Sequence, residues 1–412
     1  MNSTDADLIV IGAGAAGLAT AIFTARAEPS RRIICLDSAR RIGAKILVSG
    51  GSRCNVTNRV VSERDFWGGS PRFVRSVLRA FPAGRAREFF TDLGVHLHEE
   101  DDGKLFPDTN SSRTVLAALI RETERLRIAV VTGARVDQLR RGPRGFLVSA
   151  GDRLWGAPAV ALCTGGRSLP KTGSDGFGYE LARRLGHSCV ETVPALAPLL
   201  FGGWEMLAGV AHPAAMTLRS VATEIVRLDG PLLWTHFGAS GPLALNMSRH
   251  WHRASARGAC DVTLNVCPGE TFESLDAWLR AAERERPRAR VTTIVAGRVA
   301  GAVAERWVAA AGIAEDLTMA HLTREQRHVL VRTLLETALP IRGSRGYNYA
   351  EVTAGGIPLD EVDSASMQSR VCPGLFLTGE ILDVDGRLGG FNFQWAWSSA
   401  WVAARAIARA AT

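Results

Sequence analysis

Three glycines near the N-terminus constrain the fold of this 412-residue chain more than any other feature. They are Gly12, Gly14 and Gly17, in the spacing G-x-G-x-x-G. An apolar run at residues 7–11 precedes them and an alanine-rich segment at 15–27 follows them. The run is typical of a buried parallel strand, and the segment is typical of a helix. A second apolar run at 32–37 completes a strand–helix–strand unit.

This spacing of glycines predicts a dinucleotide site. The first glycine allows a tight turn, the second admits a pyrophosphate close to the backbone, and the third lets the helix pack on the strand. The N–H groups that open the helix then hold the phosphate charge. Asp37 ends the second strand 20 residues after Gly17, where a carboxylate can accept hydrogen bonds from ribose hydroxyls. An acid there argues against a 2′-phosphate in the site.

The motif alone leaves NAD and FAD open, and two later segments favour FAD. Thr164-Gly165-Gly166 ends one apolar run, and Thr378-Gly379-Glu380 ends another near the C-terminus. The pair resembles flavoproteins with two dinucleotide-binding domains, in which a late strand followed by glycine and an acid meets the ribityl-phosphate chain. Residues 173–178 have the wrong spacing for a second G-x-G-x-x-G, so no separate nicotinamide domain is predicted.

The rest of the chain divides into segments of different pattern. Helices are predicted over 71–92 and about 113–126, and short apolar runs over 128–163 predict an antiparallel excursion that returns to the main sheet. Composition changes near Val193, where a β-rich pattern begins and later gives way to a helical one. The predicted bounds are 1–190 with 346–412 for a nucleotide-binding domain, 191–270 with about 338–345 for a β-rich insert, and 271–337 for a helical subdomain.

Charge and cysteine content narrow the class of partner. The formal net charge is +8 and the pI about 9.5, and all but three of the 49 basic residues are arginine. The arginines are scattered without a block of five or six like charges, and the mixed-charge run RAAERERPRAR at 280–290 is typical of a solvated helix face. Seven scattered cysteines show no metal-ligand spacing and fit a reducing compartment. We expect a small-molecule substrate and neither a metal nor a nucleic-acid partner.

The location of the protein is predicted from its apolar segments. The polar N-terminus lacks the basic region of a signal peptide. The longest apolar stretch, residues 8–23, is broken by glycines and too short to cross a bilayer. A cytoplasmic protein without a membrane partner is expected, and the oligomeric state is left open.

Five further segments carry specific motifs and run almost from end to end of the chain. They read GAKILVSGGSRCNVTN (43–58), FPDTNSS (106–112), THFGASGP (235–242), YNYAEVTAGGI (347–357) and GLFLTGEILDVDGRLGGFNFQWAWSSA (374–400). Together they resemble the HI0933-like flavoproteins, whose first motif usually reads G-[RK]-K-x-x-x-S-G-G-G-R-C-N-x-T-N. This chain departs from that pattern at Ala44 and Ser52, and the serine reduces backbone freedom. The resemblance implies a non-covalent FAD enzyme of α/β class. Its Rossmann-like FAD-binding domain, of the type with two dinucleotide-binding domains, would be interrupted by a β-barrel-like insert and a small helical domain.

The motif residues supply groups that a flavin needs. Residues 49–51 form a small flexible loop that can lie against the flavin ring or pyrophosphate, while Lys45 and Arg53 can contact phosphate or the flavin carbonyl edge. The helix after residues 389–392 could direct its N–H groups at the pyrimidine end and stabilise the charge of reduced flavin. The predicted cofactor-binding residues are Gly12, Gly14, Ala15, Ala16, Gly17, Asp37, Lys45, Ser49, Gly50, Gly51, Arg53, Cys54, Asn55, Val136, Thr164, Gly165, Gly166, Gly379, Glu380, Asp385, Gly389, Gly390, Phe391 and Asn392.

The sequence names no catalytic acid or base, and two residues are candidates for a catalytic role. Cys54 is a nucleophile or redox partner, or else a small side chain packed beside the cofactor. No second cysteine at short spacing could form a disulfide with it. His236 is a polar group at the site or a histidine satisfied by its own loop. Asp383 and Asp385 bind the ribityl chain or stabilise a turn, and the tryptophans of the last motif, at helical spacing, are expected in the core.

Two classes of function agree with these features. The leading interpretation is an FAD-dependent oxidoreductase that moves a hydride between a small organic substrate and non-covalently bound FAD. The reaction is either reduction of a conjugated C=C or C=O substrate, with NAD(P)H as a transient electron donor, or oxidation of a small amine. The alternative is a flavin-containing binding or redox-sensing protein that uses a basic insert to contact RNA or a partner protein. A plain NAD dehydrogenase is a third interpretation.

Overall fold

The computed structural model describes residues 4–220 and 223–410, so both extreme ends of the predicted nucleotide-binding domain lie outside the described residues. The chain divides into two compact units, and each has its own hydrophobic core. The first unit comprises Met1–Ala195 and Tyr347–Thr412, and the second unit is Leu196–Gly346. The predicted domain bounds stay a prediction.

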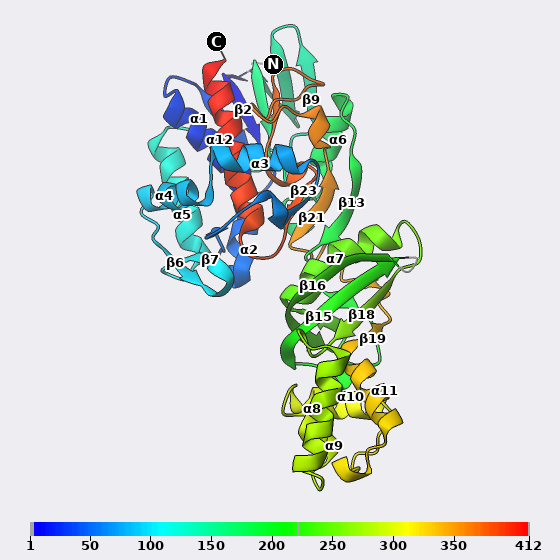
Figure 1. Ribbon diagram of the computed structural model, residues 1–412. Helices are drawn as coiled ribbons and strands as arrows, with labels where there is room; N and C mark the ends of the chain where they lie inside the picture. The colour runs from blue at the N-terminus through cyan, green and yellow to red at the C-terminus, as the bar shows by residue number, and fades with distance from the viewer. Residues whose placement is uncertain (1–3, 221–222, 411–412) are drawn as a thin grey trace. The chain divides into compact units, whose positions relative to one another are not determined.

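A five-stranded parallel sheet forms the centre of the first unit (Figure 1). In spatial order its strands are β22 (Leu375–Leu377), β12 (Ala159–Leu162), β2 (Leu8–Ile11), β3 (Ile33–Leu36) and β8 (Ala129–Val131). All four residues of the central strand β2 are buried, as its continuous apolar sequence predicts. Helix α1 (Ala15–Ala27) connects β2 to its parallel neighbour β3, so the predicted strand–helix–strand unit is confirmed.

The first unit contains further helices. They are α2 (Ala44–Ser52), α3 (Pro71–Ala80), α4 (Ala83–Asp92), α5 (Ser112–Arg125), α6 (Phe177–Arg184) and α12 (Phe391–Arg409). The last of them, red in Figure 1, packs along α1 and α3. The single helix predicted over 71–92 is wrong. Pro82 cannot continue a helix because it lacks an N–H, and it stands instead as the residue that precedes α4.

Smaller sheets extend the first unit. One is an antiparallel run of β9 (Gln138–Gly142), β10 (Gly145–Ala150) and β11 (Arg153–Ala157), with β1 (Thr4–Asp5) added parallel to β11. Since the chain then enters β12 of the central sheet, the predicted antiparallel excursion is confirmed. In the remaining small sheets, β7 (Lys104–Pro107) lies between β4 (Thr57–Asn58) and β6 (Leu97–Glu100) and pairs with both. The other two sheets pair β5 (Phe66–Gly68) with β23 (Val384–Gly386), and β13 (Val190–Ala195) with β21 (Val352–Gly356).

The second unit is built on a seven-stranded antiparallel sheet. In spatial order its strands are β19 (Thr337–Leu339), β18 (Asp261–Asn265), β15 (Ala211–Ser220), β16 (Thr223–Thr235), β17 (Gly238–Ser240), β14 (Leu199–Leu200) and β20 (Gly343–Ser344). Its helices are α7 (Gly241–Ser255), α8 (Phe272–Glu285), α9 (Val291–Val295), α10 (Gly301–Ala310) and α11 (Arg324–Leu335). Strands and helices share one core, in which Trp234 and Trp307 are fully buried.

The C-terminal tryptophans test the expected core packing. Trp395 and Trp397 of α12 are buried in the core of the first unit, as expected, and Trp401 is half-buried against that core. Within residues 4–220 and 223–410, no helix is both long enough and apolar enough to cross a membrane.

Candidate functional site

The turn between β2 and α1 requires glycine at two of its three glycine positions and leaves space at the third. Gly12 has a φ of +99°, and a Cβ there would lie 2.6 Å from the carbonyl oxygen of Cys163. A Cβ on Gly17 would lie 1.8 Å from the carbonyl oxygen of Gly12, so only glycine lets α1 approach the turn. A Cβ on Gly14 would meet nothing within 4 Å. Open space therefore adjoins the start of α1.

The start of α1 is suited to hold an anion in that space. Gly14 precedes the helix, no described side chain caps it, and its first turn carries no acid. The first four N–H groups of a helix have no partner within it, and the helix dipole places positive charge there. A pyrophosphate meets both needs, so the residues present fit FAD at this position.

Asp37 is tied to the same turn. One carboxylate oxygen accepts the N–H of Ala13 at 2.7 Å, and the other accepts the N–H of Ala39 at 2.8 Å. These bonds fix the carboxylate at the end of β3, beside the glycine turn. Each oxygen keeps a second lone pair, so the group can still accept a ribose hydroxyl.

Left-handed backbone interrupts the segment after the first turns of α2. Gly50, Gly51, Ser52 and Cys54 have φ values of +55°, +67°, +68° and +62°. Glycine adopts this conformation freely, whereas a residue with a Cβ is strained in it. Ser52, where the resemblance expects glycine, is therefore held in an unfavourable conformation. The result is an irregular loop, as the two glycines of the motif predict.

Strand β4, which follows this loop, contacts the start of α12, although the two segments are far apart in sequence. The Thr57 hydroxyl donates to Gln394 Oε1 at 2.6 Å, and Asn58 Nδ2 donates to the carbonyl oxygen of Gly389 at 3.1 Å. A Cβ on Gly390 would lie 2.5 Å from the carbonyl oxygen of Thr57. The structure thus joins the first and last motifs into one site, and the close approach requires glycine at 390.

A half-buried ionic network lies beside Gly165 and Gly166. Lys45 Nζ donates to Glu380 Oε2 and to Ser168 Oγ, each at 2.5 Å. The other oxygen of Glu380 accepts the Ser168 hydroxyl and the Thr353 N–H, each at 3.0 Å. A Cβ on Gly166 would lie 2.4 Å from Thr353 Oγ1. Two of the three partners of Glu380 were missed from the sequence, although Thr353 lies inside a motif and Ser168 follows Gly166 closely.

The late strand ends against the first turn of α1. Gly379 has a φ of +76°, and a Cβ there would lie 2.7 Å from the Cβ of Ala16. Its carbonyl oxygen accepts Trp395 Nε1 at 3.1 Å. On the neighbouring strand end, Gly165 has a φ of +70°, and the buried Thr164 hydroxyl has no hydrogen-bond partner among the described residues. This hydroxyl packs against α6, since a Cβ on Gly178 would lie 1.8 Å from its oxygen.

Arg53 is already neutralised within the protein. Its guanidinium makes two bonds to Glu100, at 2.6 and 3.2 Å, and lies 4.1 Å from the ring centre of Phe106. The hydrogen bond from Arg53 lowers the pKa of Glu100. Arg53 therefore fixes its loop on β6 and β7, and a phosphate contact remains a prediction.

Three further predicted residues lie within the first unit. Asn392 closes the turn before α12 by bonding both the N–H and the carbonyl oxygen of Gly386, at 2.8 and 2.9 Å. Asp385 is buried in β23. Val136 is buried close to Ala134, whose N–H donates to the carbonyl oxygen of Asp37 at 2.7 Å. Their contact with a cofactor remains a prediction.

The two candidate catalytic residues occupy different surroundings. Cys54 is fully buried, and burial raises the pKa of its thiol to about 12, against the smaller lowering effect of Ser49. A thiol of this kind stays protonated near neutral pH, which favours packing over nucleophilic attack. His236 lies in the second unit, between β16 and β17, with its ring centre 5.0 Å from that of Phe237. Its catalytic role remains a prediction.

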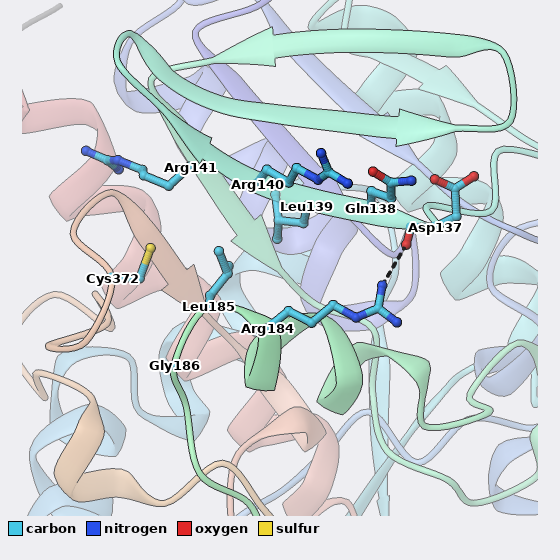
Figure 2. A pocket seen from close by; sticks show the side chains of 9 residues that line it. All are labelled: Asp137, Gln138, Leu139, Arg140, Arg141, Arg184, Leu185, Gly186 and Cys372. Carbon is cyan, nitrogen blue, oxygen red and sulfur yellow. Dashed lines mark hydrogen bonds between the residues drawn. The ribbon is translucent and has the colours of Figure 1, made fainter.

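A separate cavity of about 740 Å³ lies between β9 and α6 (Figure 2). Its lining residues are Asp137, Gln138, Leu139, Arg140, Arg141, Arg184, Leu185, Gly186 and Cys372. Arg184 crosses its floor to donate to the carbonyl oxygen of Asp137 at 3.3 Å, as the dashed line in Figure 2 shows. None of these residues belongs to the predicted cofactor set, so this cavity is distinct from the candidate site.

Comparison with known proteins gives relatives along the whole chain. A ribosomal RNA dihydrouridine synthase of Escherichia coli K12 is 32% identical over 404 residues, which cover 97% of each chain. A 3-dehydro-bile acid delta(4,6)-reductase of Clostridium scindens is 33% identical over 405 residues, covering 97% of this chain and 98% of the relative. The solved 3-ketosteroid delta1-dehydrogenase of Sterolibacterium denitrificans has a TM-score of 0.52 at 11% identity, covering 98% of this chain and 100% of that one. That last likeness concerns the fold alone.

The family comparison agrees with these relatives. The HI0933-like protein Rossmann domain matches residues 6–406. The chain therefore belongs to the HI0933-like family, and its predicted FAD-binding Rossmann fold and its predicted class as an FAD-dependent oxidoreductase are both confirmed.

Proposed function

We propose that this chain uses FAD to saturate a C=C bond conjugated to a carbonyl group. Two relatives, each about a third identical to this chain, have names that describe this chemistry. Formation of dihydrouridine saturates the ring double bond of uracil next to a carbonyl, and a delta(4,6)-reductase acts on double bonds conjugated to a 3-keto group. The observation that carries the proposal is the open space beside Gly14 at the start of α1, which fits the FAD pyrophosphate.

Different elements of the first unit would bind different parts of the cofactor. N–H groups at the start of α1 would bind the pyrophosphate, and Asp37 would bind ribose hydroxyls. The first turn of α12 follows the Gly389–Gly390 turn, and its positive end would stabilise negative charge on the reduced ring system. FAD, when bound, supplies two-electron transfer to an electron-poor carbon. The network of Lys45 and Glu380 would hold the neighbouring loops in place.

A reductase needs an electron donor, and we propose a reduced nicotinamide for this role. It would bind transiently, because no second G-x-G-x-x-G provides a resident site. The donor would visit the flavin and leave after transfer. Anaerobic mixing of the purified protein with NADH or NADPH tests this, with the visible flavin absorbance as the readout. Rapid bleaching is expected with one of the two. Bleaching by small amines instead would favour the oxidase interpretation and contradict the proposal.

The second half of the reaction is tested with two acceptors. Reduced protein is mixed anaerobically with protein-free ribosomal RNA or with a ketosteroid that has a conjugated double bond, and recovery of flavin absorbance is followed. Recovery with either acceptor, together with a product heavier by two hydrogens, supports the proposal. A flavin that neither acceptor reoxidises would contradict it and favour a redox-sensing role.

A further inference from the structure

Seven residues in the second unit, 284–290, carry four arginines and one acid; we call them the arginine segment. The segment runs from the last turn of α8 to the residue before α9 (Figure 1). Its arginines are Arg284, Arg286, Arg288 and Arg290, and all four side chains are exposed. Arg284 complements the dipole at the end of α8, so the argument rests on the three arginines that follow the helix.

The structure separates charges that the sequence shows as mixed. Glu283 lies 3.9 Å from Arg327, and Asp276 pairs with both Arg280 and Arg327. Throughout residues 4–220 and 223–410, no carboxylate lies within ion-pair distance of the arginines of the segment. Of the two acids within residues 280–290, Glu283 is thus directed at Arg327, and the exposed Glu285 is the one acid of the segment itself. Among the described residues, the arginines of the segment thus carry no paired carboxylate, and the other exposed acids on adjoining backbone are Glu315 and Asp316, which precede the Thr318 that bridges to Arg290.

The backbone of the segment is fixed. Carbonyl oxygens of Pro287 and Ala289 accept the N–H groups of Ala320 and Met319, each at 2.9 Å, and the N–H of Val291 donates to the carbonyl oxygen of Leu317 at 3.0 Å. Ala289 packs against the core of the second unit, while its two neighbouring arginines are exposed. The guanidinium groups are therefore presented from a scaffold that is ordered before any partner binds, which reduces the entropic cost of binding.

We propose that the arginine segment binds RNA phosphates and so delivers an RNA substrate to the enzyme. This inference rests on the proposed function, in which uracil is one possible acceptor, and it selects RNA over a free small molecule. The guanidinium fork matches phosphate oxygens and stays charged at any relevant pH. The segment contains no large apolar residue, which a surface that inserts into lipid would need.

The test compares two triple variants of the full-length, FAD-loaded protein. One is Arg286→Gln with Arg288→Gln and Arg290→Gln. The control, Arg113→Gln with Arg121→Gln and Arg144→Gln, removes the same charge from exposed positions of the first unit. Binding of fluorescent protein-free ribosomal RNA is measured over a range of salt. The segment variant should lose at least about tenfold in affinity, and its salt slope should fall by about 2, since each lost contact with single-stranded RNA removes about 0.7.

The outcomes separate this inference from the proposed function. Equal RNA affinity of the two variants would overturn the inference. Binding to vesicles of anionic lipid is measured in parallel, and a segment variant that loses affinity for the vesicles but not for RNA would also overturn it. Bleaching by the reduced nicotinamide is measured on the same samples and should be unchanged in both variants. If bleaching or acceptor reduction fails in the unsubstituted protein while RNA binding depends on the segment, the proposed function fails and the RNA surface stands.

Discussion

At the scale of single residues, the space around a glycine decides what its substitution does. A Cβ on Gly14 meets nothing within 4 Å, and its φ of −84° is open to any residue. We therefore expect Gly14→Val to fold normally but to lose bound flavin, because the new side chain fills the pyrophosphate position. The measurement is flavin absorbance per protein after purification, together with thermal unfolding of the flavin-free protein.

Gly17 provides the matched control for that experiment. A Cβ there would lie 1.8 Å from a backbone oxygen, which cannot move without displacing the turn. Gly17→Ala should therefore lower thermal stability even in flavin-free protein, unlike Gly14→Val. A yellow Gly14→Val protein with normal flavin content would show that the pyrophosphate lies elsewhere.

Ser52 gives a prediction of the opposite sign. The residue is exposed and has a φ of +68°, which costs a residue with a Cβ about 1 kcal/mol or more relative to glycine. Ser52→Gly should raise the free energy of unfolding by up to about 1 kcal/mol, after allowance for the greater freedom of glycine in the unfolded chain. Denaturant unfolding measures the change. Ser52→Ala is the control, since it keeps the Cβ and should not stabilise; equal effects of the two variants would contradict the argument.

Roles that depend on local sequence were predictable, and roles that depend on distant contacts were not. The glycines of the first turn and Asp37 follow one another within a single strand–helix–strand unit, so their spacing is enough to place them. Lys45 and Glu380 were named singly, but nothing in the sequence pairs them with each other or with Ser168, because the three lie on segments that only the folded sheet brings together.

At the scale of elements, the contact between β4 and α12 holds two motifs together. Gln394 is fully buried, accepts the Thr57 hydroxyl at 2.6 Å and donates to the carbonyl oxygen of Phe81 at 2.8 Å. Ser398 also donates to that carbonyl, at 2.8 Å, so Gln394→Leu leaves chiefly the Thr57 hydroxyl unsatisfied. We expect the free energy of unfolding to fall by about 1–3 kcal/mol, the usual cost of a buried unpaired group.

A double-mutant cycle checks this cause. Thr57→Val removes the unpaired hydroxyl. Adding this substitution to Gln394→Leu should therefore recover part of the lost free energy of unfolding. Strictly additive losses, measured by denaturant unfolding, would show that the hydrogen bond is not the reason. The cycle also reports on the site, since flavin retention should follow the position of β4.

Elements were predicted well where their pattern is continuous and poorly where one residue interrupts it. The apolar run of β2 and the glycines after it gave strand and helix correctly. Over 71–92 the apolar spacing continues through Pro82. Periodicity alone therefore does not reveal that the chain leaves one helix before Pro82 and begins another after it.

At the scale of the whole molecule, two separate cores predict two folding units. The second unit is one continuous segment, residues 196–346, with a core of its own that includes Trp234 and Trp307. Expressed alone, this segment should fold and unfold cooperatively, since domains of this size with their own core are usually stable. Circular dichroism and denaturant unfolding of the fragment provide the measurement. A fragment without a cooperative transition would show that the second core depends on the rest of the chain.

The same fragment should lose stability in mild acid. Burial lowers the pKa of His250 to about 3 and that of His252 to about 4, both in α7, from an ordinary 6.5. Above pH 6.5 both histidines are neutral in the folded and unfolded chain, so their contribution to stability is fully present. As the pH falls below 6.5, the unfolded chain binds protons that the folded chain does not, and each histidine lowers the free energy of unfolding by at most about 1.4 kcal/mol per pH unit.

Denaturant midpoints should therefore be lower at about pH 5 than at about pH 7.5. Replacing both histidines by glutamine should flatten this dependence, whereas His321→Gln, at an exposed position outside α7, should leave it in place. An unchanged pH dependence in the double variant would assign the acid sensitivity to other groups of the unit, among them His212, whose pKa burial also lowers.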